Sequence, residues 1–235
     1  MERENGMSNQ TKYRIICSLT TWSKRIGSCK PTLDSIINQT RKPDLIEINL
    51  SYEQFPNGEA DIPDFLKEMP VKIYWKDKDQ HVYDKFLPTW KRHKGEDFIN
   101  ITVDDDCIYE PEYIEQVAKN MEGYDFLASQ DDIATAGEWM CYRSTVTDKM
   151  IPYLTDQLIE DTPLDDHTLL YLLRKVGAKR GHKVEAKVID QNLGYGFRRY
   201  WNTEIPEEEC TKKAVGYPHS EYIKELNMLR RYGIV

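Results

Sequence analysis

Short apolar runs, separated by stretches with helical periodicity, dominate the first half of the chain. Runs rich in β-branched residues predict buried strands, and they occur at Tyr13–Ser18, Asp44–Leu50, Val71–Trp75 and Phe98–Val103. Between these runs, apolar residues recur at helical spacing, which predicts helices at Ser28–Gln39 and Asp64–Glu68. Strands that alternate with helices indicate an α/β fold with a mostly parallel sheet.

The second half of the chain has a less regular pattern. Helical periodicity predicts helices at Pro111–Met121, Pro163–Val176 and Tyr222–Leu229. Shorter apolar runs predict strands at Phe126–Ala128, Glu138–Arg143 and Val184–Ile189. Since no stretch of the sequence resembles a flexible linker, we expect a single domain over residues 12–235, preceded by a disordered extension at residues 1–11.

Composition and charge exclude several classes of protein. The 235 residues include 32 Lys and Arg against 40 Asp and Glu, and the net charge of -8 argues against nucleic-acid binding. The five cysteines form no C-x-x-C pair, which argues against a zinc site or a disulfide framework. No apolar run approaches the ~20 residues that span a bilayer, and the first residues lack the apolar core of a signal peptide. We therefore expect a cytoplasmic protein; peripheral contact of the helix at Tyr222–Leu229 with the inner face of the membrane stays open beside packing of that helix on the core.

Three consecutive carboxylates, Asp104, Asp105 and Asp106, directly follow the predicted strand Phe98–Val103. Ligands of open α/β sheets bind beyond the carboxyl ends of the strands. If the chain stays extended, Asp104 and Asp106 point to one side, where they can share a divalent cation. Ordinary surface charge is the competing interpretation. An EF-hand loop is excluded, because Ile108 and Tyr109 occupy positions that require Asp or Asn and Gly.

Four segments of the first half carry a family resemblance: IICSLTTWSKR at 15–25, PTLDSIINQT at 31–40, KPD at 42–44 and ITVDDDCIY at 101–109. Together they resemble the nucleotide-binding half of GT-A glycosyltransferases, in particular bacterial enzymes that build surface polysaccharide. The resemblance covers residues 13–110 and weakens after residue 125. It implies a Rossmann-like GT-A fold, with a nucleotide-sugar-binding half at 12–110 and an acceptor and catalytic half at 111–235.

The resemblance also implies a nucleotide-sugar donor, UDP-linked, whose diphosphate is bridged by Mn²⁺ or Mg²⁺ to the DXD motif. Asp104 is expected near the ribose and the metal, Asp106 on the metal, and Asp105 on the donor sugar or facing away. Further donor-binding residues are expected after the first strand and before the metal strand, namely Thr20, Thr21, Trp22, Arg25 and Lys85. In related enzymes a late histidine completes the metal shell. His219 has a suitable position, with His182 as its competitor and a surface role as the plain alternative.

A base is needed to take the proton of a hydroxyl acceptor. In inverting members of the fold, an acid at the start of a helix beyond the DXD motif serves, which here points to Asp165 and Asp166. Thr162 and Asp165 match a helix-start pattern, so Asp165 has a structural explanation and Asp166 is the preferred base. The pair Asp131–Asp132 is the second candidate, and His167 is a possible contributor.

The sequence thus predicts a metal-dependent, inverting glycosyltransferase that moves a sugar from a UDP-sugar to a glycan or glycolipid hydroxyl. Trp139, Tyr142 and Trp201 are candidates for stacking on sugars, with burial in the core as the alternative. Three other classes stay open: a sugar-phosphate nucleotidyltransferase, a carbohydrate-binding module and a glycoside hydrolase. Residues 18–26 contain no glycine, which counts against the nucleotidyltransferase.

Overall fold

A computed structural model of the chain describes residues 13–128, 139–162, 165–181, 188–189 and 219–235. The predicted extension at residues 1–11 lies outside these ranges.

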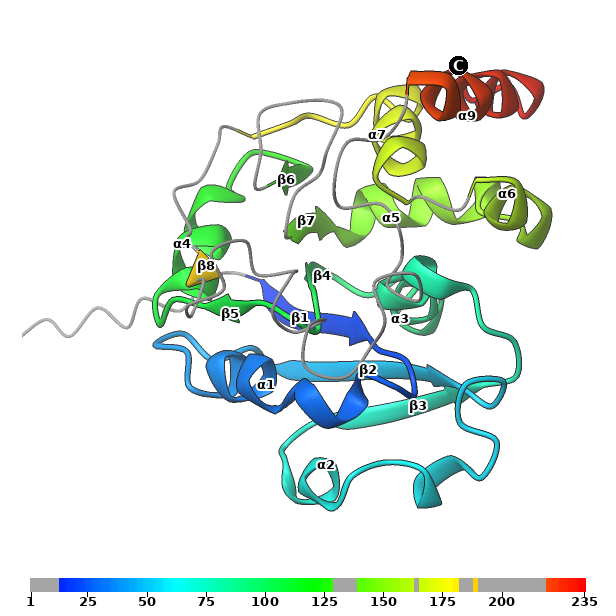
Figure 1. Cartoon of the computed structure of the whole chain (residues 1–235). Helices are drawn as coiled ribbons and strands as arrows, with labels where there is room; N and C mark the ends of the chain where they lie inside the picture. The colour runs from blue at the N-terminus through cyan, green and yellow to red at the C-terminus, as the bar shows by residue number, and fades with distance from the viewer. Residues whose placement is uncertain (1–12, 129–138, 163–164, 182–187, 190–218) are drawn as a thin grey trace, which may run out of the picture.

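A six-stranded sheet with the order β3-β2-β1-β4-β7-β6 forms the centre of the molecule (Figure 1). Strands β1 to β4 are mutually parallel, and β7 runs antiparallel to both of its neighbours. The bounds are β1 Arg14–Thr20, β2 Leu45–Ser51, β3 Lys72–Lys76, β4 Phe98–Val103, β6 Phe126–Ala128 and β7 Trp139–Arg143. The mostly parallel α/β sheet that the sequence predicted is confirmed.

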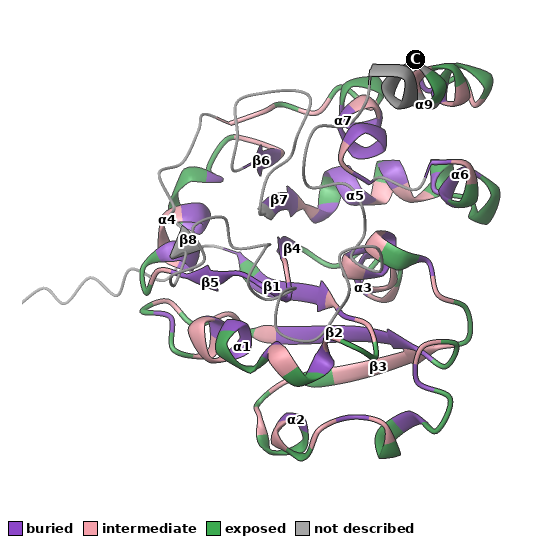
Figure 2. Ribbon diagram, viewed as in Figure 1, coloured by how far each residue is buried: buried purple, intermediate pink, exposed green. Residues whose placement is uncertain are grey.

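The central strands are buried on both faces, which explains their continuous apolar runs. Every residue of β4 is buried, as are five consecutive residues of β1 and six of β2 (Figure 2). Parallel strands covered by helices on both faces cannot alternate apolar and polar residues as half-exposed strands do.

The first face of the sheet packs against α1 (Lys30–Ile37), α2 (Asp64–Glu68) and α4 (Tyr113–Asn120). Helix α1 has a proline in its first turn, a position where the missing N–H costs no hydrogen bond. Its buried Leu33 and Ile36 join Ile15, Ile48 and Ile101 of the strands in one apolar cluster.

The second face packs against α3 (Leu87–Arg92), α5 (Ser144–Met150), α6 (Asp156–Asp161), α7 (Asp165–Lys175) and α9 (His219–Arg231). In Figure 1, α5, α6, α7 and α9 gather beyond β7, at the end of the molecule opposite α2. Trp90, Met140 and Leu172 belong to this second cluster, and so does Tyr142, which is 1% exposed. Stacking of Tyr142 on a sugar is therefore wrong, because its ring is part of the core.

Short elements complete the described chain. They are the short 3-10 helices η1 (Ile26–Ser28), η2 (Gly58–Ala60), η3 (His81–Lys85) and η4 (Ile151–Tyr153), and a two-stranded sheet of β5 (Ile108–Tyr109) with β8 (Val188–Ile189). The predicted strand 184–189 is described only at its last two residues.

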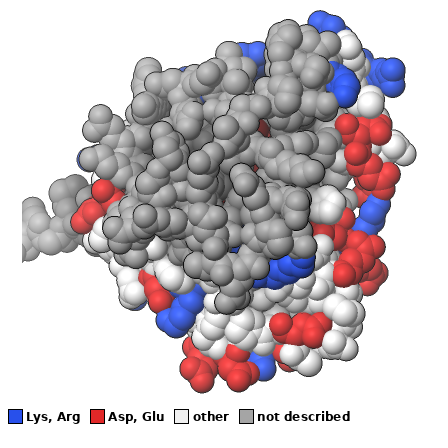
Figure 3. Space-filling view, in the orientation of Figure 1, with Lys and Arg blue, Asp and Glu red and all other residues white. Residues whose placement is uncertain are grey.

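Acidic side chains gather along one edge of the described surface, over α6 (Figure 3). Asp156, Glu160 and Asp161 belong to this helix, and Glu160 pairs with Lys78. Within the described residues, no helix is both long and apolar enough to cross a membrane.

Candidate active site

The carboxyl ends of four parallel strands lie at one edge of the sheet. Strand β1 ends at Thr20 and the adjacent β4 at Val103, with Ser18 paired to Thr102. The segment after β1 and the acidic triplet after β4 are therefore neighbours in space, although about 80 residues separate them in sequence. This edge holds the predicted donor-binding residues.

The backbone of the triplet turns away from the strand direction. Strand β4 ends at Val103, and Asp105 and Asp106 form a turn. The N–H of Asp104 donates to the hydroxyl oxygen of Tyr109 (2.9 Å), and the Thr32 hydroxyl donates to the carbonyl of Asp105 (3.0 Å). The expectation of an extended triplet is therefore wrong, because these two side chains hold the backbone in a turn.

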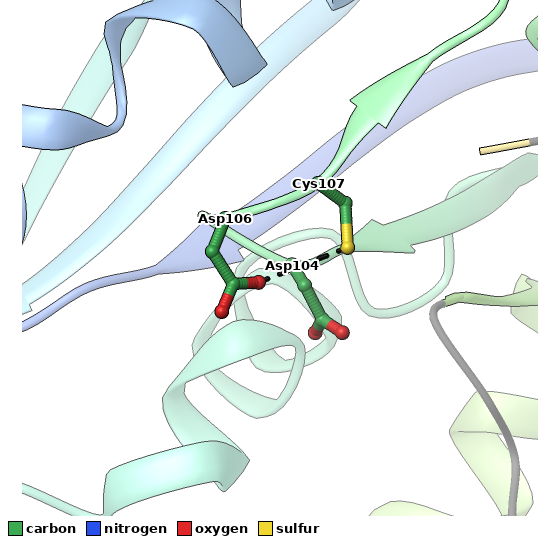
Figure 4. A group of neighbouring side chains, drawn as sticks. All are labelled: Asp104, Asp106 and Cys107. Carbon is green, nitrogen blue, oxygen red and sulfur yellow. Dashed lines mark hydrogen bonds between the residues drawn. The ribbon is translucent and has the colours of Figure 1, made fainter. Parts of the chain in front are cut away.

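The turn nevertheless brings Asp104 and Asp106 together. Ligand atoms of Asp104, Asp106 and Cys107 all lie within 4.8 Å of one another (Figure 4). The Cys107 Sγ lies 3.7 Å from Oδ1 of Asp106. The pairing of the two carboxylates was predicted, whereas Cys107 was not considered, although it directly follows the triplet.

The guanidinium group of Arg25 binds two carboxylates of the triplet, those of Asp105 and Asp106. Its Nε donates to Asp105 Oδ2 (3.0 Å), its Nη2 also contacts Asp105, and its Nη1 donates to Asp106 Oδ2 (3.2 Å). Asp105 is 3% exposed, so its charge is compensated by this two-pronged contact. Arg25 was predicted to bind the donor, and in the structure it binds two carboxylates of the triplet.

Burial governs the pKa of Asp106. Removal from water and repulsion from Asp105 raise the pKa of Asp106 to about 7, although the attraction of Arg25 opposes this shift. For Arg25, burial by itself lowers the pKa, but Asp105 and Asp106 outweigh burial and raise it above its ordinary value. Arg25 thus stays charged at every physiological pH.

Lys85 connects the triplet to the amino-terminal end of α7. It lies at the end of η3 and forms an ion pair with Asp104. Burial by itself lowers the pKa of Lys85, but attraction to Asp104, Asp165 and Asp166 outweighs burial and raises it. The two acids of α7 are therefore close enough to Lys85 for charge interaction.

The two adjacent acids of α7 have different surroundings. Asp165 is 9% exposed, whereas Asp166 is half-buried. Burial and the neighbouring Asp166 raise the pKa of Asp165 to about 7, with Lys85 opposing the shift. His167, also considered as a contributor, is buried.

A buried ion pair fixes the segment that carries Lys85. Asp84 is 1% exposed and pairs with Lys76 at the end of β3. The second oxygen of Asp84 accepts the backbone N–H of Gln80 (3.0 Å), and Lys76 also donates to the Gln80 side chain (2.6 Å). The chain thus enters η3 at a fixed position.

A second buried cluster fixes α3, which follows η3 directly. Glu47 of β2 is fully buried, and its carboxylate accepts hydrogen bonds from Thr89 (2.7 Å) and Arg92. The ring of His93 lies 2.8 Å from the other Glu47 oxygen. Since β2 belongs to the sheet, this cluster sets where Lys85 stands relative to the triplet. Nothing in the sequence pattern marked Glu47, which is an isolated acid within an apolar run.

The residues after β1 occupy three different environments. The Thr20 hydroxyl donates to the Asn49 carbonyl (2.7 Å), so it is engaged in the protein. The Thr21 Oγ1 is buried and has no hydrogen-bond partner among the described residues. Trp22 is half-buried, with the Lys24 ammonium 5.6 Å from its ring centroid. An unpaired buried hydroxyl is costly in a folded protein unless a ligand satisfies it.

Several candidate residues lie outside the described residues. These are the Asp131–Asp132 pair, His182 and Trp201. His219 begins α9, but its side chain is not described, so its role as a metal ligand stays a prediction.

The donor set fits a divalent cation. Asp104 and Asp106 offer two hard oxygen ligands close together, the number that Mg²⁺-type sites in proteins commonly use. Arg25 and Lys85 stand on either side, so that anionic groups of a ligand would meet positive charge there. The orphaned Thr21 hydroxyl, after the adjacent strand, is consistent with a ligand at this edge.

No family model matches the sequence, and none of the curated proteins matches it. Solved structures do match the fold. TarS 1–349 from S. aureus superposes with a TM-score of 0.52, at 12% identity, over 93% of this chain and 72% of that chain. Its complex with UDP gives a TM-score of 0.53, at 12% identity, over 74% and 59%.

A mannosyltransferase, PcManGT from Pyrobaculum calidifontis, in complex with GDP-Man and Mn²⁺, matches with a TM-score of 0.46, at 12% identity, over 72% of this chain and 54% of that chain. The 4-diphosphocytidyl-2C-methyl-D-erythritol synthase from Anaerococcus prevotii gives 0.49, at 11% identity, over 77% and 94%. The chain therefore spans between half and two thirds of the length of PcManGT and of the UDP complex of TarS. Given the sheet order and the superposition on TarS, the chain has the GT-A glycosyltransferase fold.

Proposed function

We propose that the chain is a metal-dependent glycosyltransferase that moves a sugar from a nucleotide sugar, UDP-linked, to a hydroxyl of a glycan or glycolipid. The observation that carries this proposal is the position of Asp104 and Asp106. Both lie at the carboxyl edge of a GT-A sheet, within shared reach of a cation, and between Arg25 and Lys85. A nucleoside diphosphate needs such a combination of divalent cation and basic side chains.

The residues at this edge have distinct roles in the proposal. Asp106 and Asp104 hold Mn²⁺ or Mg²⁺, which when bound neutralises the charge that develops on the departing diphosphate. With a cation on Asp104, the ammonium of Lys85 would be available to pair with the diphosphate. Thr21 and Trp22 receive the nucleoside, the hydroxyl as a hydrogen-bonding group and the ring as an apolar surface.

Asp166 serves as the base in this proposal. The residue is half-buried, and it lies near Lys85 at the amino-terminal end of α7. Asp165 is the alternative, since its pKa of about 7 suits a base that works near neutral pH. Loss of turnover in Asp166→Asn with full donor binding, and retained turnover in Asp165→Asn, is the pattern expected if Asp166 is the base.

The proposal is tested with a panel of nucleotide sugars, each assayed for hydrolysis and transfer with Mn²⁺, with Mg²⁺ and with EDTA. We expect one UDP-sugar to be turned over with metal and none with EDTA. Turnover of free oligosaccharides in EDTA would instead indicate a glycoside hydrolase. Formation of a nucleotide sugar from a nucleoside triphosphate and a sugar phosphate would indicate a nucleotidyltransferase.

Asp106→Asn provides the matched test of the cation site. We expect turnover and metal-dependent UDP binding to fall at least about 100-fold, since a charged ligand of the cation is lost. The fold should persist, because burial already disfavours the ionised form of the Asp106 carboxyl group, and the substitution replaces this group with a neutral amide. Asp64→Asn, an exposed acid on α2, is the control and should retain full activity. Full activity in Asp106→Asn would refute the metal-dependent proposal.

A further inference from the structure

We propose that Cys107 is a third protein ligand of the cation site, so that the site prefers thiophilic divalent cations such as Zn²⁺ and Cd²⁺ over Mg²⁺. The inference rests on the cation site of the proposed function, but not on the transfer reaction. Its starting observation is that one atom from each of Asp104, Asp106 and Cys107 lies within 4.8 Å of the others (Figure 4).

The distance between two of the ligand atoms is close to that of a tetrahedral metal site. Zinc binds sulfur at about 2.3 Å and carboxylate oxygen at about 2.0 Å, which places two tetrahedral ligands about 3.5 Å apart. The Cys107 Sγ and Asp106 Oδ1 are 3.7 Å apart. An ion therefore fits between them with a shift of a few tenths of an ångström, and Asp104 joins by a small rotation of its side chain.

The two carboxylate oxygens of Asp106 contact different partners. Oδ2 accepts a hydrogen bond from Arg25, while Oδ1 faces the Cys107 sulfur. A cation on Oδ1 thus leaves the contact with Arg25 in place, and Arg25 continues to hold the carboxylate in position. The ion pair between Lys85 and Asp104 must open, and the hydrogen bond from the Cys107 thiol to Asp106 is replaced by the two bonds to the cation.

Burial also favours an ion that gives up its water. Cys107 is 5% exposed and Asp106 is 2% exposed, so the inner side of the site has little room for the several waters that Mg²⁺ keeps. The Asp104 side chain is 17% exposed and marks the open side, where a ligand atom or a water completes the coordination. Thiolate is a soft ligand, which selects Zn²⁺ and Cd²⁺ over Mg²⁺. On binding, the thiol proton leaves to solvent and the sulfur binds as thiolate.

Cadmium titration of the full chain without nucleotide tests the inference. A thiolate on Cd²⁺ gives an ultraviolet charge-transfer band that carboxylates do not give. We expect the band in the wild type, and its loss in Cys107→Ser together with a fall in Cd²⁺ affinity, because the soft thiolate ligand is gone. The affinity for Mg²⁺, measured by competition, should stay unchanged in this variant. Cys210→Ser is the control for unrelated thiols and should keep the band.

Two results would overturn the inference: a band of undiminished strength in Cys107→Ser, or equal losses of Cd²⁺ and Mg²⁺ affinity. Circular dichroism melting of each variant shows whether it is folded, and Cys107→Ala provides a second substitution if the serine is not tolerated. Because no nucleotide is present, this result is independent of the transferase assays. Cd²⁺ binding through Cys107 without any nucleotide-sugar turnover would refute the proposed function alone.

Discussion

At the scale of single residues, the pKa values of two buried carboxyl groups of the site are raised for the same reasons. Asp106 and Asp165 are each withdrawn from water and stand beside another aspartate, and each has a pKa of about 7. The nearby cations partly offset this rise in pKa: Arg25 and Lys85 at Asp106, and Lys85 at Asp165. Such carboxyls indicate a site built for binding rather than for stability, because apolar residues would fill the same space at lower cost.

The pKa of Asp165 predicts a pH-dependent stability. An unfolded aspartate has a pKa of about 3.9, so between that pH and about 7 the folded chain holds a proton that the unfolded chain has released. Stability therefore falls as pH rises through this window, and the loss is complete above pH 7. Asp165→Asn has no such proton to lose. Each pKa unit corresponds to about 1.4 kcal/mol, so the variant should exceed the wild type by about 2–4 kcal/mol at pH 8 and by little at pH 4.5.

Urea unfolding at a series of pH values measures this difference. Asp34→Asn, which alters a half-exposed acid of α1, is the control and should show no comparable gain at pH 8. A difference between Asp165→Asn and wild type that is constant across the series would contradict the assignment of a raised pKa to Asp165.

Individual site residues were predictable only where the sequence places them next to a recognisable element. The triplet follows an apolar strand, and Asp165 and Asp166 open a periodic helix, so each was found. The contacts of Arg25 with Asp105 and Asp106 were not, since they join residues about 80 positions apart through a turn that no local pattern specifies. The family resemblance suggested Arg25 and Lys85, but not their carboxylate partners.

At the scale of elements, apolar continuity made the strands predictable. The bounds of β4 and β6 are those predicted, because each is a compact apolar run with polar residues on both sides. Helices α5 and α6 were missed. Helix α5 has the sequence STVTDKM, whose β-branched residues disfavour a helix, and it forms because Val146 and Met150 pack in the second cluster. Tertiary packing, which the local pattern does not contain, overrides propensity there.

The buried Glu47 cluster gives a prediction for how α3 is held on the sheet. In Glu47→Gln, Arg92 and His93 keep their positions but lose the carboxylate that accepts their hydrogen bonds. Breaking a buried charge pair costs about 3–5 kcal/mol, and the amide recovers part of this, so a loss of about 2–3 kcal/mol is expected in urea unfolding. Because α3 continues from η3, the affinity for UDP with metal should fall as well. Glu68→Gln, at the exposed end of α2, should change neither quantity.

At the scale of the whole molecule, the two apolar clusters share strands β6 and β7. In β6 and β7, Leu127 and Cys141 face the first cluster, while Phe126, Met140 and Tyr142 face the second. Neither cluster can lose its order without exposing strands on which the other depends. The single domain that the sequence suggested remains a prediction, and cooperative unfolding of both clusters is its physical consequence.

Helix α9 tests this cooperativity, because it reaches the second cluster from the end of the chain. Leu229 is fully buried in that cluster, and the neighbouring Tyr232 hydroxyl donates to Asp161 of α6. Truncation of a buried leucine to alanine costs about 2–5 kcal/mol, and for a chain of this size each kcal/mol lowers Tm by about 2–4 °C. Leu229→Ala should therefore lower Tm by about 5–15 °C, with circular dichroism and tryptophan fluorescence reporting one coincident transition.

Asn227→Ala, exposed on the same helix, should leave Tm nearly unchanged. A separate early transition in Leu229→Ala would mean that α9 unfolds by itself, and the prediction of one cooperative domain would then be wrong.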